Sequence, residues 1–583
     1  MNRTHNNGEL RISDVNKIVE LKGWVAKKRN LGSLVFIDLR DRYGITQIVL
    51  NEEMEALAKD IKNEYVIHVV GKVIERSSKN PNMPTGDIEI EASQIDIINT
   101  AKVTPIYTSD DTDASEDARM QYRYLDLRRP VMQNKIITRH KITRSIRDFL
   151  DNHDFIDIET PYLNRSTPEG ARDFLVPSRV HNGSFYALPQ SPQLFKQLLM
   201  VSGFERYYQI ARCFRDEDLR LDRQPEFTQV DVEMSFMNTD EIITLGEQLI
   251  AKVMKDVKGI DLQLPLPRMT WHEAMEKYGI DKPDIRFGLE LVNLNEVVKD
   301  VDFMVFKSAL EANGHVKGIN VKGEANNFSR KAIDKLTDIV KTYKAKGLAW
   351  LKVKDGKAEG PIAKFFNGEQ MTRLLTAMDA SDDDLLLFVS DAKYSVVCDA
   401  LAALRNHLGK ELKLYRQDEY AFLWVVDFPM FEYDEETKRY YAVHHPFTRP
   451  KDSDLDKIEN DPANCLADAY DIVLNGFELG GGSQRIYEQE LQERAFRALG
   501  FTQERIDSQF GWFVEAFQYG TPPHGGFALG LDRLAMILTN SENIREVIAF
   551  PKNASAVCPM SKAPGKVDKE QLDELKIAVI EDE

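Results

Sequence analysis

The sequence predicts a multidomain α+β protein, and three observations support this prediction. The chain has 583 residues, which exceeds the roughly 100–200 residues of a typical single domain. Hydrophobic residues make up 43% and charged residues 29% of it, a composition typical of globular domains and unlike that of disordered chains. Alternating strand patterns fill the first hundred or so residues, whereas mixed strand and helix patterns fill the remainder.

The N-terminal segment 1–105 predicts a small closed β-barrel. Apolar and polar residues alternate over five short runs, with one helix expected at 52–62. Glycine, asparagine and proline residues interrupt the runs, as in Asn30-Leu31-Gly32 and in the 80–86 segment. Five strands in about 100 residues are typical of an OB-fold.

Beyond this barrel, the sequence predicts a linker and one domain in two parts. A polar linker or hinge is expected at 106–130, before an amphipathic helix that begins near Pro130. Strand and helix patterns then fill 131–280 and return over 416–583, which would also carry a C-terminal extension. Between them, 281–415 contains its own helices and strands, so we expect a complete α+β unit inserted into the larger domain.

Several protein classes are disfavoured by the composition. No apolar run approaches the roughly 18 residues that a membrane helix needs, and the start MNRTHNNGEL lacks the apolar core of a secretory signal. The four cysteines are far apart and form no CxxC pair, which argues against a disulfide framework and a zinc knuckle. We therefore expect a soluble, cytoplasmic protein without a membrane partner.

The charge distribution leaves room for a nucleic-acid partner. The chain carries 76 Lys+Arg and 94 Asp+Glu, and its net charge of −18 would ordinarily argue against one. Residues 1–105, however, hold 15 Lys and Arg and 15 Asp and Glu, so the whole excess lies downstream. Lys27, Lys28 and Arg29 form a basic cluster in this neutral segment, and local charge decides whether a phosphate backbone binds.

The first of four candidate motifs comprises Cys213–Glu217 and Gln224–Gln229. Period-two alternation on either side predicts two strands joined by a charged loop. Arg215 and Glu217, two residues apart on one strand, would point to the same face. A guanidinium and a carboxylate on one face suit a polyphosphate with an amine-bearing base, whereas the plainer interpretation is a salt bridge on an edge strand.

The second motif, Gly525–Arg533, predicts a glycine-rich turn from a strand into a helix. Glycines allow close approach of a ligand, and Arg533 would offer a charge to phosphate from the start of the helix. The pattern is not the GxxxxGK[ST] of a P-loop.

Glycines and a turn define the other two motifs. Phe477–Arg485 places three glycines between an acid and a base, so the floor of a binding site there would be free of side chains. A strand bulge also explains such a run. Gln190–Lys196 is a turn into a helix, whose simpler explanation is capping by Ser191 with Pro192 at the first helical position.

Taken together and in this order, the motifs resemble those of class II aminoacyl-tRNA synthetases, and in particular the bacterial-type aspartate-specific family. The resemblance covers essentially the whole chain and is highly specific. It rests on Tyr122–Pro130, the end of motif 1 at Ile158–Pro161, Thr167–Asp173, motif 2 at Phe214–Glu217, Ala442–Thr448 and motif 3 around Gly530–Arg533. It implies an OB-fold anticodon-binding domain, a class II antiparallel-sheet catalytic domain and a GAD-like inserted α+β domain.

The resemblance implies roles for the nucleotide site, with Arg215, Glu217 and Arg533 as catalytic residues. Arg215 would hold the α-phosphate of ATP and Glu217 the adenine amine, while Phe227 would stack on the ring. Mg²⁺ would be bound by Asp471 and Glu478 through oxygen ligands, although a lone Asp at a strand start is more often a cap. The implied ATP-binding residues are Arg215, Asp216, Glu217, Gln224, Phe227, Glu478, Gly530, Leu531, Asp532 and Arg533.

The resemblance likewise implies a site for L-aspartate. Arg485 would offer a bidentate fork to the side-chain carboxylate and Lys196 a second positive charge, so neutral asparagine would bind poorly. Of the pair His444-His445, the resemblance implies His444 as the substrate contact; the alternative is one core-packed and one solvated ring. The implied residues are Glu169, Ser191, Gln193, Lys196, Arg215, Asp231, His444, His445 and Arg485.

The implied reaction has two steps and a tRNA partner. The α-carboxylate of aspartate attacks the α-phosphorus of ATP to give aspartyl-adenylate and pyrophosphate, and the aspartyl group then passes to the 3′ end of tRNA-Asp with release of AMP. Phe36 would stack on an anticodon base, although a core position is the default for a strand phenylalanine. The implied anticodon contacts are Arg29, Leu31, Phe36, Gln47 and Glu89. The family also implies a homodimer formed through motif 1.

Leu31 bears on which tRNAs are charged. Family members that also aspartylate tRNA-Asn commonly carry His-Gly at this loop, and leucine cannot donate a hydrogen bond to a base. We therefore favour an enzyme restricted to tRNA-Asp; the alternatives are an enzyme that charges both tRNA-Asp and tRNA-Asn, or a leucine that merely packs against the barrel.

Two other functions remain as alternatives at this stage. An asparagine- or lysine-specific ligase would share the scaffold, but Lys196 with Arg485 and the inserted domain argue against it. A non-catalytic RNA-binding relative is disfavoured by the intact set Arg215, Glu217, Glu478 and Arg533.

Overall fold

The computed structural model describes residues 3–31, 34–167 and 170–580. The chain forms two compact units, one of residues 1–138 with 545–566 and the other of residues 139–544 with 567–583. Within the described part of the chain, no helix has the length and apolar character to span a bilayer.

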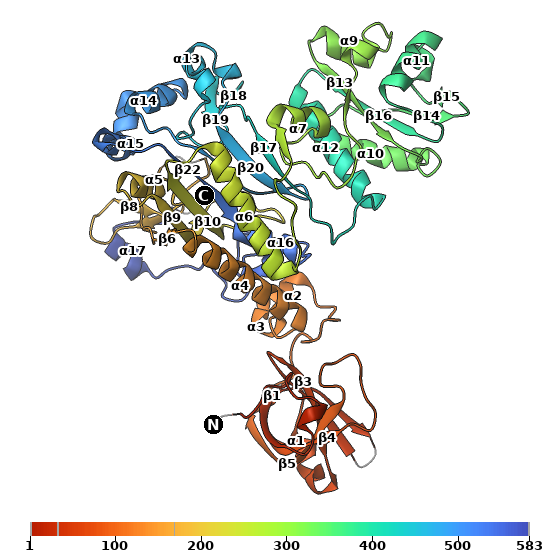
Figure 1. Cartoon of the computed structure of the whole chain (residues 1–583), viewed down its shortest axis with the longest axis vertical. Coiled ribbons are helices and arrows are strands. Elements are labelled where there is room, and N and C mark those ends of the chain that lie inside the picture. The colour runs from red at the N-terminus through yellow and green to blue at the C-terminus, as the bar shows by residue number, and fades with distance from the viewer. Residues whose placement is uncertain (1–2, 32–33, 168–169, 581–583) are drawn as a thin grey trace. The chain divides into compact units, whose positions relative to one another are not determined.

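The first unit contains a closed five-stranded barrel, which confirms the predicted OB-fold (Figure 1). Its strand order is β1-β2-β3-β5-β4, and alternate side chains of each strand, such as Val19, Ile37 and Ile67, fill the core. The helix expected at 52–62 is shorter, because α1 covers only Glu55–Asp60 after a 3₁₀ turn. The strands are β1 (Ile18–Leu31), β2 (Leu34–Asp41), β3 (Gly44–Leu50), β4 (Val66–Glu75) and β5 (Ile88–Asn99).

The segment expected as a linker contains two short helices organised around one buried carboxylate. Helices α2 (Glu116–Gln121) and α3 (Arg123–Asp126) precede the long helix α4 (Pro130–Asp151). The carboxylate of Asp126 is fully buried and accepts hydrogen bonds from Arg119 at 2.9 Å and from Arg123 and Arg129 at 2.8 Å. Arg123 and Arg129 of the Tyr122–Pro130 segment, together with Arg119, therefore serve the internal structure of the first unit.

An eight-stranded sheet forms the centre of the second unit. Its order is β11-β17-β20-β21-β22-β10-β9-β6, antiparallel except at the two edge pairs. Strands from before and after the insertion lie side by side, since β10 pairs with β22. The strands are β6 (Ile156–Asp157), β9 (Arg206–Phe214), β10 (Glu226–Ser235), β11 (Arg268–Thr270), β17 (Phe422–Val426), β20 (Ala469–Leu474), β21 (Phe477–Gln484) and β22 (His524–Gly530).

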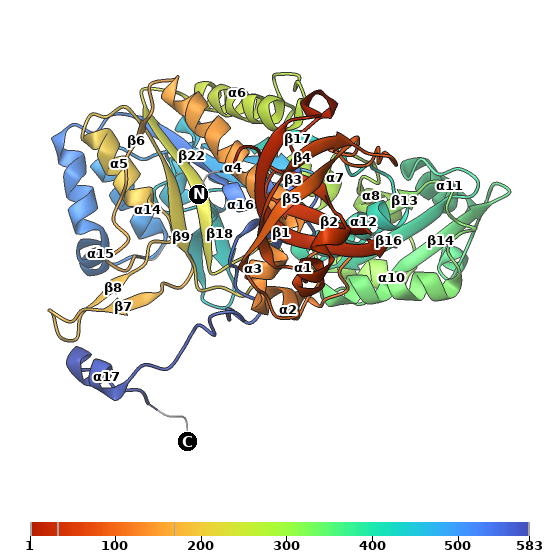
Figure 2. The same ribbon diagram turned by 90° about the horizontal axis from the view of Figure 1, so that it is seen from below.

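The second unit also contains helices and two β-hairpins. Figure 2 shows α14 and α15 beside α5, where Leu194, Phe447, Phe496 and Phe510 form an aromatic-rich core. On α6, Gly246 allows close approach of the Trp424 ring, because a Cβ there would lie 3.2 Å from it. The helices are α5 (Gln193–Val201), α6 (Thr239–Lys258), α7 (Trp271–Tyr278), α13 (Lys457–Asn460), α14 (Gln489–Ala498), α15 (Gln503–Ala516), α16 (Leu531–Leu538) and α17 (Lys569–Leu575); the hairpins are β7 (Leu175–Pro177) with β8 (Phe185–Ala187) and β18 (Phe431–Asp434) with β19 (Arg439–Ala442).

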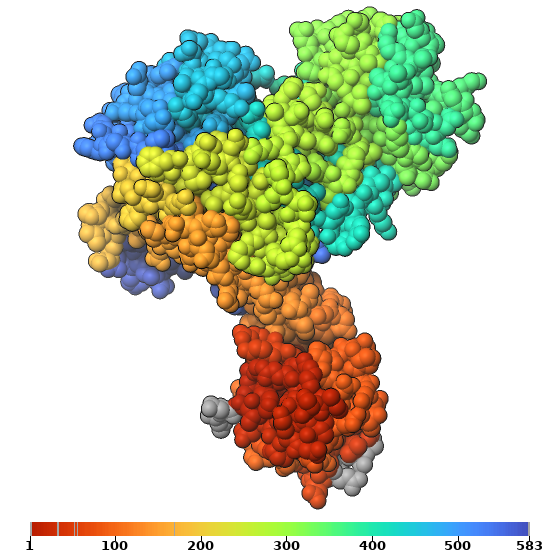
Figure 3. Space-filling model, in the orientation of Figure 1, coloured from red at the N-terminus to blue at the C-terminus, as the bar shows by residue number. Residues whose placement is uncertain are grey.

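The inserted segment has its own sheet and its own hydrophobic cores. The sheet order is β12-β13-β16-β14-β15, and two separate hydrophobic clusters involve this sheet and its helices. In Figure 3 the segment is the green to cyan surface. The strands are β12 (Val292–Asn293), β13 (His315–Val321), β14 (Ala349–Lys354), β15 (Lys357–Glu359) and β16 (Leu385–Asp391); the helices are α8 (Asn295–Val298), α9 (Met304–Glu311), α10 (Arg330–Thr342), α11 (Gly368–Ala377) and α12 (Tyr394–Glu411).

Candidate active site

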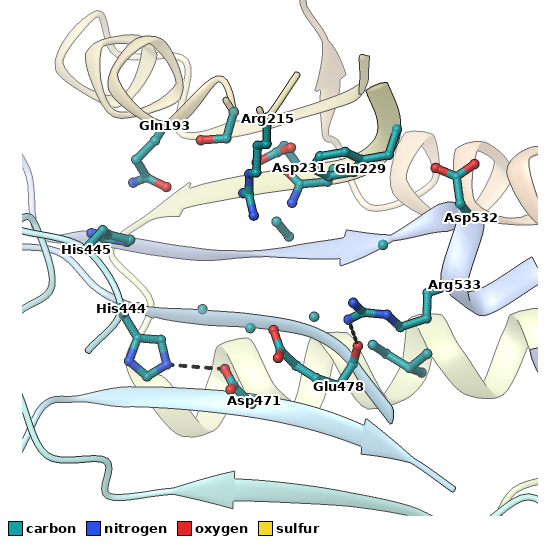
Figure 4. Close-up of a pocket in the computed structure, with 18 of the residues that line it drawn as sticks. Gln193, Arg215, Gln229, Asp231, His444, His445, Asp471, Glu478, Asp532 and Arg533 are labelled. Carbon is teal, nitrogen blue, oxygen red and sulfur yellow. Dashed lines mark hydrogen bonds and ion pairs between the residues drawn. The ribbon is translucent and has the colours of Figure 1, made fainter. Parts of the chain in front are cut away.

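A polar cavity of about 460 Å³ is lined by strands β10, β20, β21 and β22, by helices α5 and α16, and by the loops beside them. It brings together most of the residues that the sequence singled out (Figure 4). Those lining it are Ser191, Gln193, Lys196, Arg215, Glu217, Gln224, Phe227, Asp231, His444, His445, Asp471, Glu478, Arg485, Gly530, Asp532 and Arg533. Of the rest, Asp216 and the buried Leu531 do not line it, and Glu169 lies outside the described residues.

The glycines of β21 form the floor of the cavity. A Cβ on Gly481 would lie 2.0 Å from Oδ1 of Asp471, and one on Gly482 would lie 2.1 Å from the carbonyl oxygen of Gly526. The strand also carries a bulge, because Ile472 pairs with Gly480 and Val473 with Glu478, which leaves Leu479 extra. The bulge and the open floor, considered as alternatives from the sequence, are therefore both present.

Arg215 and Glu217 do not lie on a strand, which corrects the sequence prediction. Strand β9 ends at Phe214, and the amide of Arg215 donates to the carbonyl of Pro225. Proline has no N–H to return a bond, so the ladder ends there. Arg215 lies over the Phe227 ring at 5.1 Å, while Glu217 pairs with Arg223 at 2.9 Å in the loop.

At one side of the cavity, two carboxylates form an acidic pair with cations around them. Nε2 of His444 lies 3.3 Å from Oδ1 of Asp471, and Nζ of Lys282 lies 3.5 Å from Oε2 of Glu478. Burial and the nearby Glu478 raise the pKa of Asp471, although His444 opposes them. Burial would raise the pKa of Glu478 as well, but Lys282 and Arg533 outweigh it and lower that pKa.

The chemistry of this acidic pair fits Mg²⁺. Among the described residues, no group of three or more His, Cys, Asp or Glu side chains is arranged to hold a metal ion. Mg²⁺ in nucleotide sites is commonly held by one or two carboxylates together with water and substrate phosphates, which matches two carboxylates on a polar cavity.

At the other side of the cavity, four charged side chains form a buried cluster. Nζ of Lys196 lies 3.2 Å from Asp231 and 3.3 Å from Glu233, while Arg485 donates from Nε at 2.9 Å and from Nη2 at 3.1 Å to Glu233. None of the four is more than 2% exposed. Burial would raise the pKa of Glu233, but Arg485 and Lys196 lower it to about 2.

Glu233 was missed from the sequence although a signal for it exists. Gln229, Asp231 and Glu233 alternate along β10 and share one face of the strand. Two carboxylates on a buried strand require cationic partners, and sequence reasoning had assigned Lys196 and Arg485 to the ligand instead. Gln229, the last residue of the first motif, also lines the cavity, although the sequence assigned no role to it.

The two histidines of the His444-His445 pair are both half-buried, and each has a polar partner. Nη1 of Arg485 donates to Nε2 of His445 at 2.8 Å and to the Ser483 hydroxyl at 2.6 Å. Burial and the Arg485 charge hold the pKa of His445 well below its usual value, so this ring is a neutral acceptor. The alternative of one core-packed and one solvated ring is wrong.

Several polar side chains make contacts other than those that the sequence predicted. The Asp532 carboxylate is 1% exposed, accepts the Thr228 amide at 2.6 Å and pairs with Arg139, so it supports the turn into α16. Pro192, rather than Ser191, is the N-cap residue of α5. Asp231 Oδ2 and Gln193 Nε2 are buried without a hydrogen-bond partner among the described residues, as atoms awaiting a polar ligand would be.

On the barrel of the first unit, three of the predicted anticodon contacts form one network. Arg29 donates to Gln47 at 3.0 Å, and Gln47 donates to Glu89 at 2.6 Å. Phe36, which pairs with Arg29 across β1 and β2, is half-buried and lies outside the barrel core. Leu31, at the end of β1, is 64% exposed, so the alternative that it packs against the barrel is wrong.

Comparisons with known proteins relate both units to one group. Residues 115–554 match the family model described as tRNA synthetases class II (D, K and N), and residues 19–98 match that of the OB-fold nucleic acid binding domain. The aspartate–tRNA ligase of Halalkalibacterium halodurans is 58% identical, over 99% of this chain and 98% of that protein. The aspartate–tRNA(Asp/Asn) ligase of Bacillus cereus is also 58% identical with the same coverage.

Solved structures agree with this grouping at the level of the fold. Asparaginyl-tRNA synthetase from Pyrococcus horikoshii, complexed with asparaginyl-adenylate, has a TM-score of 0.58 and 18% identity, over 93% of this chain and 96% of that one. The enzyme from Entamoeba histolytica has a TM-score of 0.59 and 18% identity, over 94% and 97%.

Proposed function

The chain belongs to the aspartate–tRNA ligases among the class II aminoacyl-tRNA synthetases, and from this premise we propose that it joins L-aspartate to tRNA-Asp with ATP in the described cavity. The observation that carries the proposal is the buried Lys196–Glu233–Arg485 cluster beside a nucleotide-sized cavity with an acidic pair at its far side. We also propose a cytoplasmic location, because tRNA and ATP are available there.

The first step needs alignment and charge neutralisation more than proton transfer. The α-carboxylate of aspartate attacks the α-phosphorus of ATP, where Arg215 would stabilise the developing charge, while Phe227 and Glu217 would hold the adenine. Asp471 and Glu478 would hold Mg²⁺, which supplies charge neutralisation on the phosphate oxygens. Asp231 Oδ2 and Gln193 Nε2, which have no hydrogen-bond partner among the described residues, would receive the polar groups of the amino acid.

Selection of aspartate would rest on the buried cations Arg485 and Lys196. Most of their N–H groups already face acceptors of the protein. A guanidinium has five N–H donors, and Arg485 directs four of them to Glu233, His445 and Ser483. It therefore offers one N–H rather than the bidentate fork expected from the sequence. Lys196, which already contacts Asp231 and Glu233, would offer a second N–H donor to the substrate carboxylate. The amide nitrogen of asparagine would face an N–H donor there, which disfavours it.

ATP–pyrophosphate exchange tests this proposal. Exchange should be driven by aspartate, with asparagine and lysine at least about 100-fold less effective. Exchange driven by asparagine or lysine would instead assign the chain to another ligase of the group, and the absence of exchange with every amino acid would indicate a non-catalytic relative.

For the tRNA, we propose restriction to tRNA-Asp. The relatives carry both names at the same 58% identity, so their names do not decide the matter. The exposed Leu31 has no donor or acceptor for a base, and a loop residue of this kind would change specificity by about 1–3 kcal/mol. Purified tRNA-Asp and tRNA-Asn should be charged unequally by the wild type and more equally by Leu31→His. Equal charging by the wild type would overturn the restriction.

We further propose a homodimer built on the short edge strand β6. Its outer edge has no strand partner among the described residues, and an unpaired edge readily accepts a second chain. Apolar side chains are exposed on β6 and on the β7–β8 hairpin, including Ile156 at 48% and Leu175 at 58%.

A further inference from the structure

The connector of residues 279–291, which joins α7 to β12 at the entry to the inserted unit, reaches the candidate active site. Asp281 lines the cavity, and Nζ of Lys282 lies 3.5 Å from Oε2 of Glu478 and 3.6 Å from Oδ1 of Asp281. Neither residue belongs to a motif that the sequence singled out. The connector therefore adds a cation beside the carboxylate that we assign to Mg²⁺.

The inserted unit holds this connector in place through Arg405 of α12. Its guanidinium is 1% exposed and donates to the carbonyl oxygens of Asp284 at 2.9 Å, Phe287 at 2.6 Å and Gly288 at 3.0 Å. It also lies over the rings of Tyr278 and Phe287, at 4.7 and 4.1 Å. Three carbonyls and two rings fix the backbone directly after Lys282, so its position depends on the inserted unit.

The ammonium of Lys282 is placed to receive another anion. Its two contacts, at 3.5 and 3.6 Å, are longer than the roughly 2.7–3.2 Å of a normal N–H···O bond, so its N–H groups are not locked. Its side chain is 39% exposed. Arg533, which donates to the backbone carbonyl of Glu478, is the residue that the sequence motif assigns to phosphate. Two cations thus contact Glu478, Lys282 at its carboxylate and Arg533 at its backbone carbonyl.

We propose that Lys282 binds the β- and γ-phosphates of ATP and stabilises the departing pyrophosphate, and that the inserted unit supports catalysis by positioning it. In the step concerned, an aspartate carboxylate oxygen bonds to the α-phosphorus, and the bond from that phosphorus to the bridging oxygen breaks. The electron pair leaves with pyrophosphate, and no proton is transferred. Lys282 neutralises part of the charge that appears on the leaving group. This inference rests on the proposed function.

Lys282→Met tests the inference, with Lys277→Met as its matched control. Lys277 is an exposed residue of α7, five positions earlier, and forms no ion pair among the described residues. The KM for pyrophosphate in aspartate-dependent exchange should rise about 10- to 100-fold in Lys282→Met, as expected for one charge-assisted contact. Pyrophosphate binding measured by calorimetry should weaken equally, whereas the KM for aspartate should stay within about twofold. Lys277→Met should match the wild type in all three.

The outcomes separate the possible roles of Lys282. An unchanged KM and affinity for pyrophosphate in Lys282→Met would overturn the inference. So would a changed Mg²⁺ dependence with unchanged pyrophosphate binding, because Lys282 would then serve Glu478 alone. A wild type without aspartate-dependent exchange would instead contradict the proposed function.

A second variant tests the part played by the inserted unit. Arg405→Lys keeps the charge but loses the planar fork, and it should raise the KM for pyrophosphate by at least about twofold. If Arg405 acts through Lys282, this effect should disappear in the Lys282→Met background. Full additivity of the two effects, or no effect of Arg405→Lys, would overturn the positioning role.

Discussion

The amino-acid site that we propose lies beside a buried cluster of four charged residues, Lys196, Asp231, Glu233 and Arg485. Their formal charges sum to zero, and they are almost completely buried. Removing charges from water is costly unless they are paired and hydrogen-bonded, and removing one partner leaves the other uncompensated. Each residue of this cluster should therefore affect both folding stability and substrate binding.

Arg485→Leu should abolish aspartate-dependent exchange while leaving ATP binding nearly intact. The substrate carboxylate and Glu233 both lose a partner, at a cost of about 3–5 kcal/mol. Arg485→Lys, which keeps the charge, should retain part of the activity. Exchange rates and ATP titrations measure the effects, and thermal unfolding controls for loss of the fold. Unchanged exchange in Arg485→Leu would refute the assigned role.

Phe36→Ala should weaken tRNA charging without affecting aspartate activation. Phe36 lies outside the barrel core beside the Arg29–Gln47–Glu89 network, so it is available to stack on a base. Loss of one stacked base costs about 1–3 kcal/mol, or roughly 10- to 100-fold in the KM for tRNA. Ile98→Ala, at a 49% exposed position of β5, is the control. Equal tRNA KM values for Phe36→Ala and the wild type would argue against stacking.

At the scale of elements, the glycine run of β21 decides where the acidic pair lies. Asp471 on β20 faces Gly481 on β21, and only the absence of a side chain there leaves room for its carboxylate. The run therefore fixes the position of a proposed Mg²⁺ ligand through sterics alone.

Gly481→Ala should lower aspartate-dependent exchange by about 100-fold, because displacement of a site group by 1 Å commonly costs that much. The added Cβ would lie 2.0 Å from Asp471 Oδ1 and push the carboxylate away. Gly511→Ala, in α15 with nothing within 4 Å, should be neutral or slightly stabilising. Exchange kinetics of both variants provide the test, and near-normal activity of Gly481→Ala would show that Asp471 is dispensable.

Asp126→Asn should destabilise the first unit in a pH-dependent way. Burial would raise the pKa of Asp126, but hydrogen bonds from Arg119 and Arg129 outweigh it and lower that pKa below its ordinary 3.8. A lowered folded-state pKa means that the stabilisation is complete above about pH 4 and is lost as pH falls further. We expect a loss of about 3–5 kcal/mol at neutral pH, seen as a lower melting temperature by calorimetry. A variant as stable as the wild type at pH 7 would contradict this.

At the scale of the whole molecule, the proposed dimer should be sensitive to its edge strand. Wild-type protein should sediment as a dimer at micromolar concentration, and Ile156→Asp should raise the dimer Kd at least about tenfold by placing a charge in each copy of an isologous contact. Val305→Asp, at a 49% exposed position of α9 in the inserted unit, should leave the mass unchanged. A fully active wild-type monomer would rule out the dimer as a functional requirement.

The sequence by itself determined the motifs, their order and much of the local structure. Period-two alternation predicted the barrel strands, and the glycine-rich turn placed Arg533 at the start of α16, because these features depend on neighbouring residues. The set of motifs identified the family, and it named most of the residues that line the cavity.

Only the tertiary structure decided how those residues are paired. Glu233 and Arg485 are 252 positions apart in the chain. Lys282 and Glu478 are in contact although the inserted unit separates them in the sequence. Arg215 leaves its strand because Pro225, on the neighbouring strand segment, cannot return a hydrogen bond. Local propensity carries no information about such partners, since buried charges are paired by whichever side chains the sheet brings together.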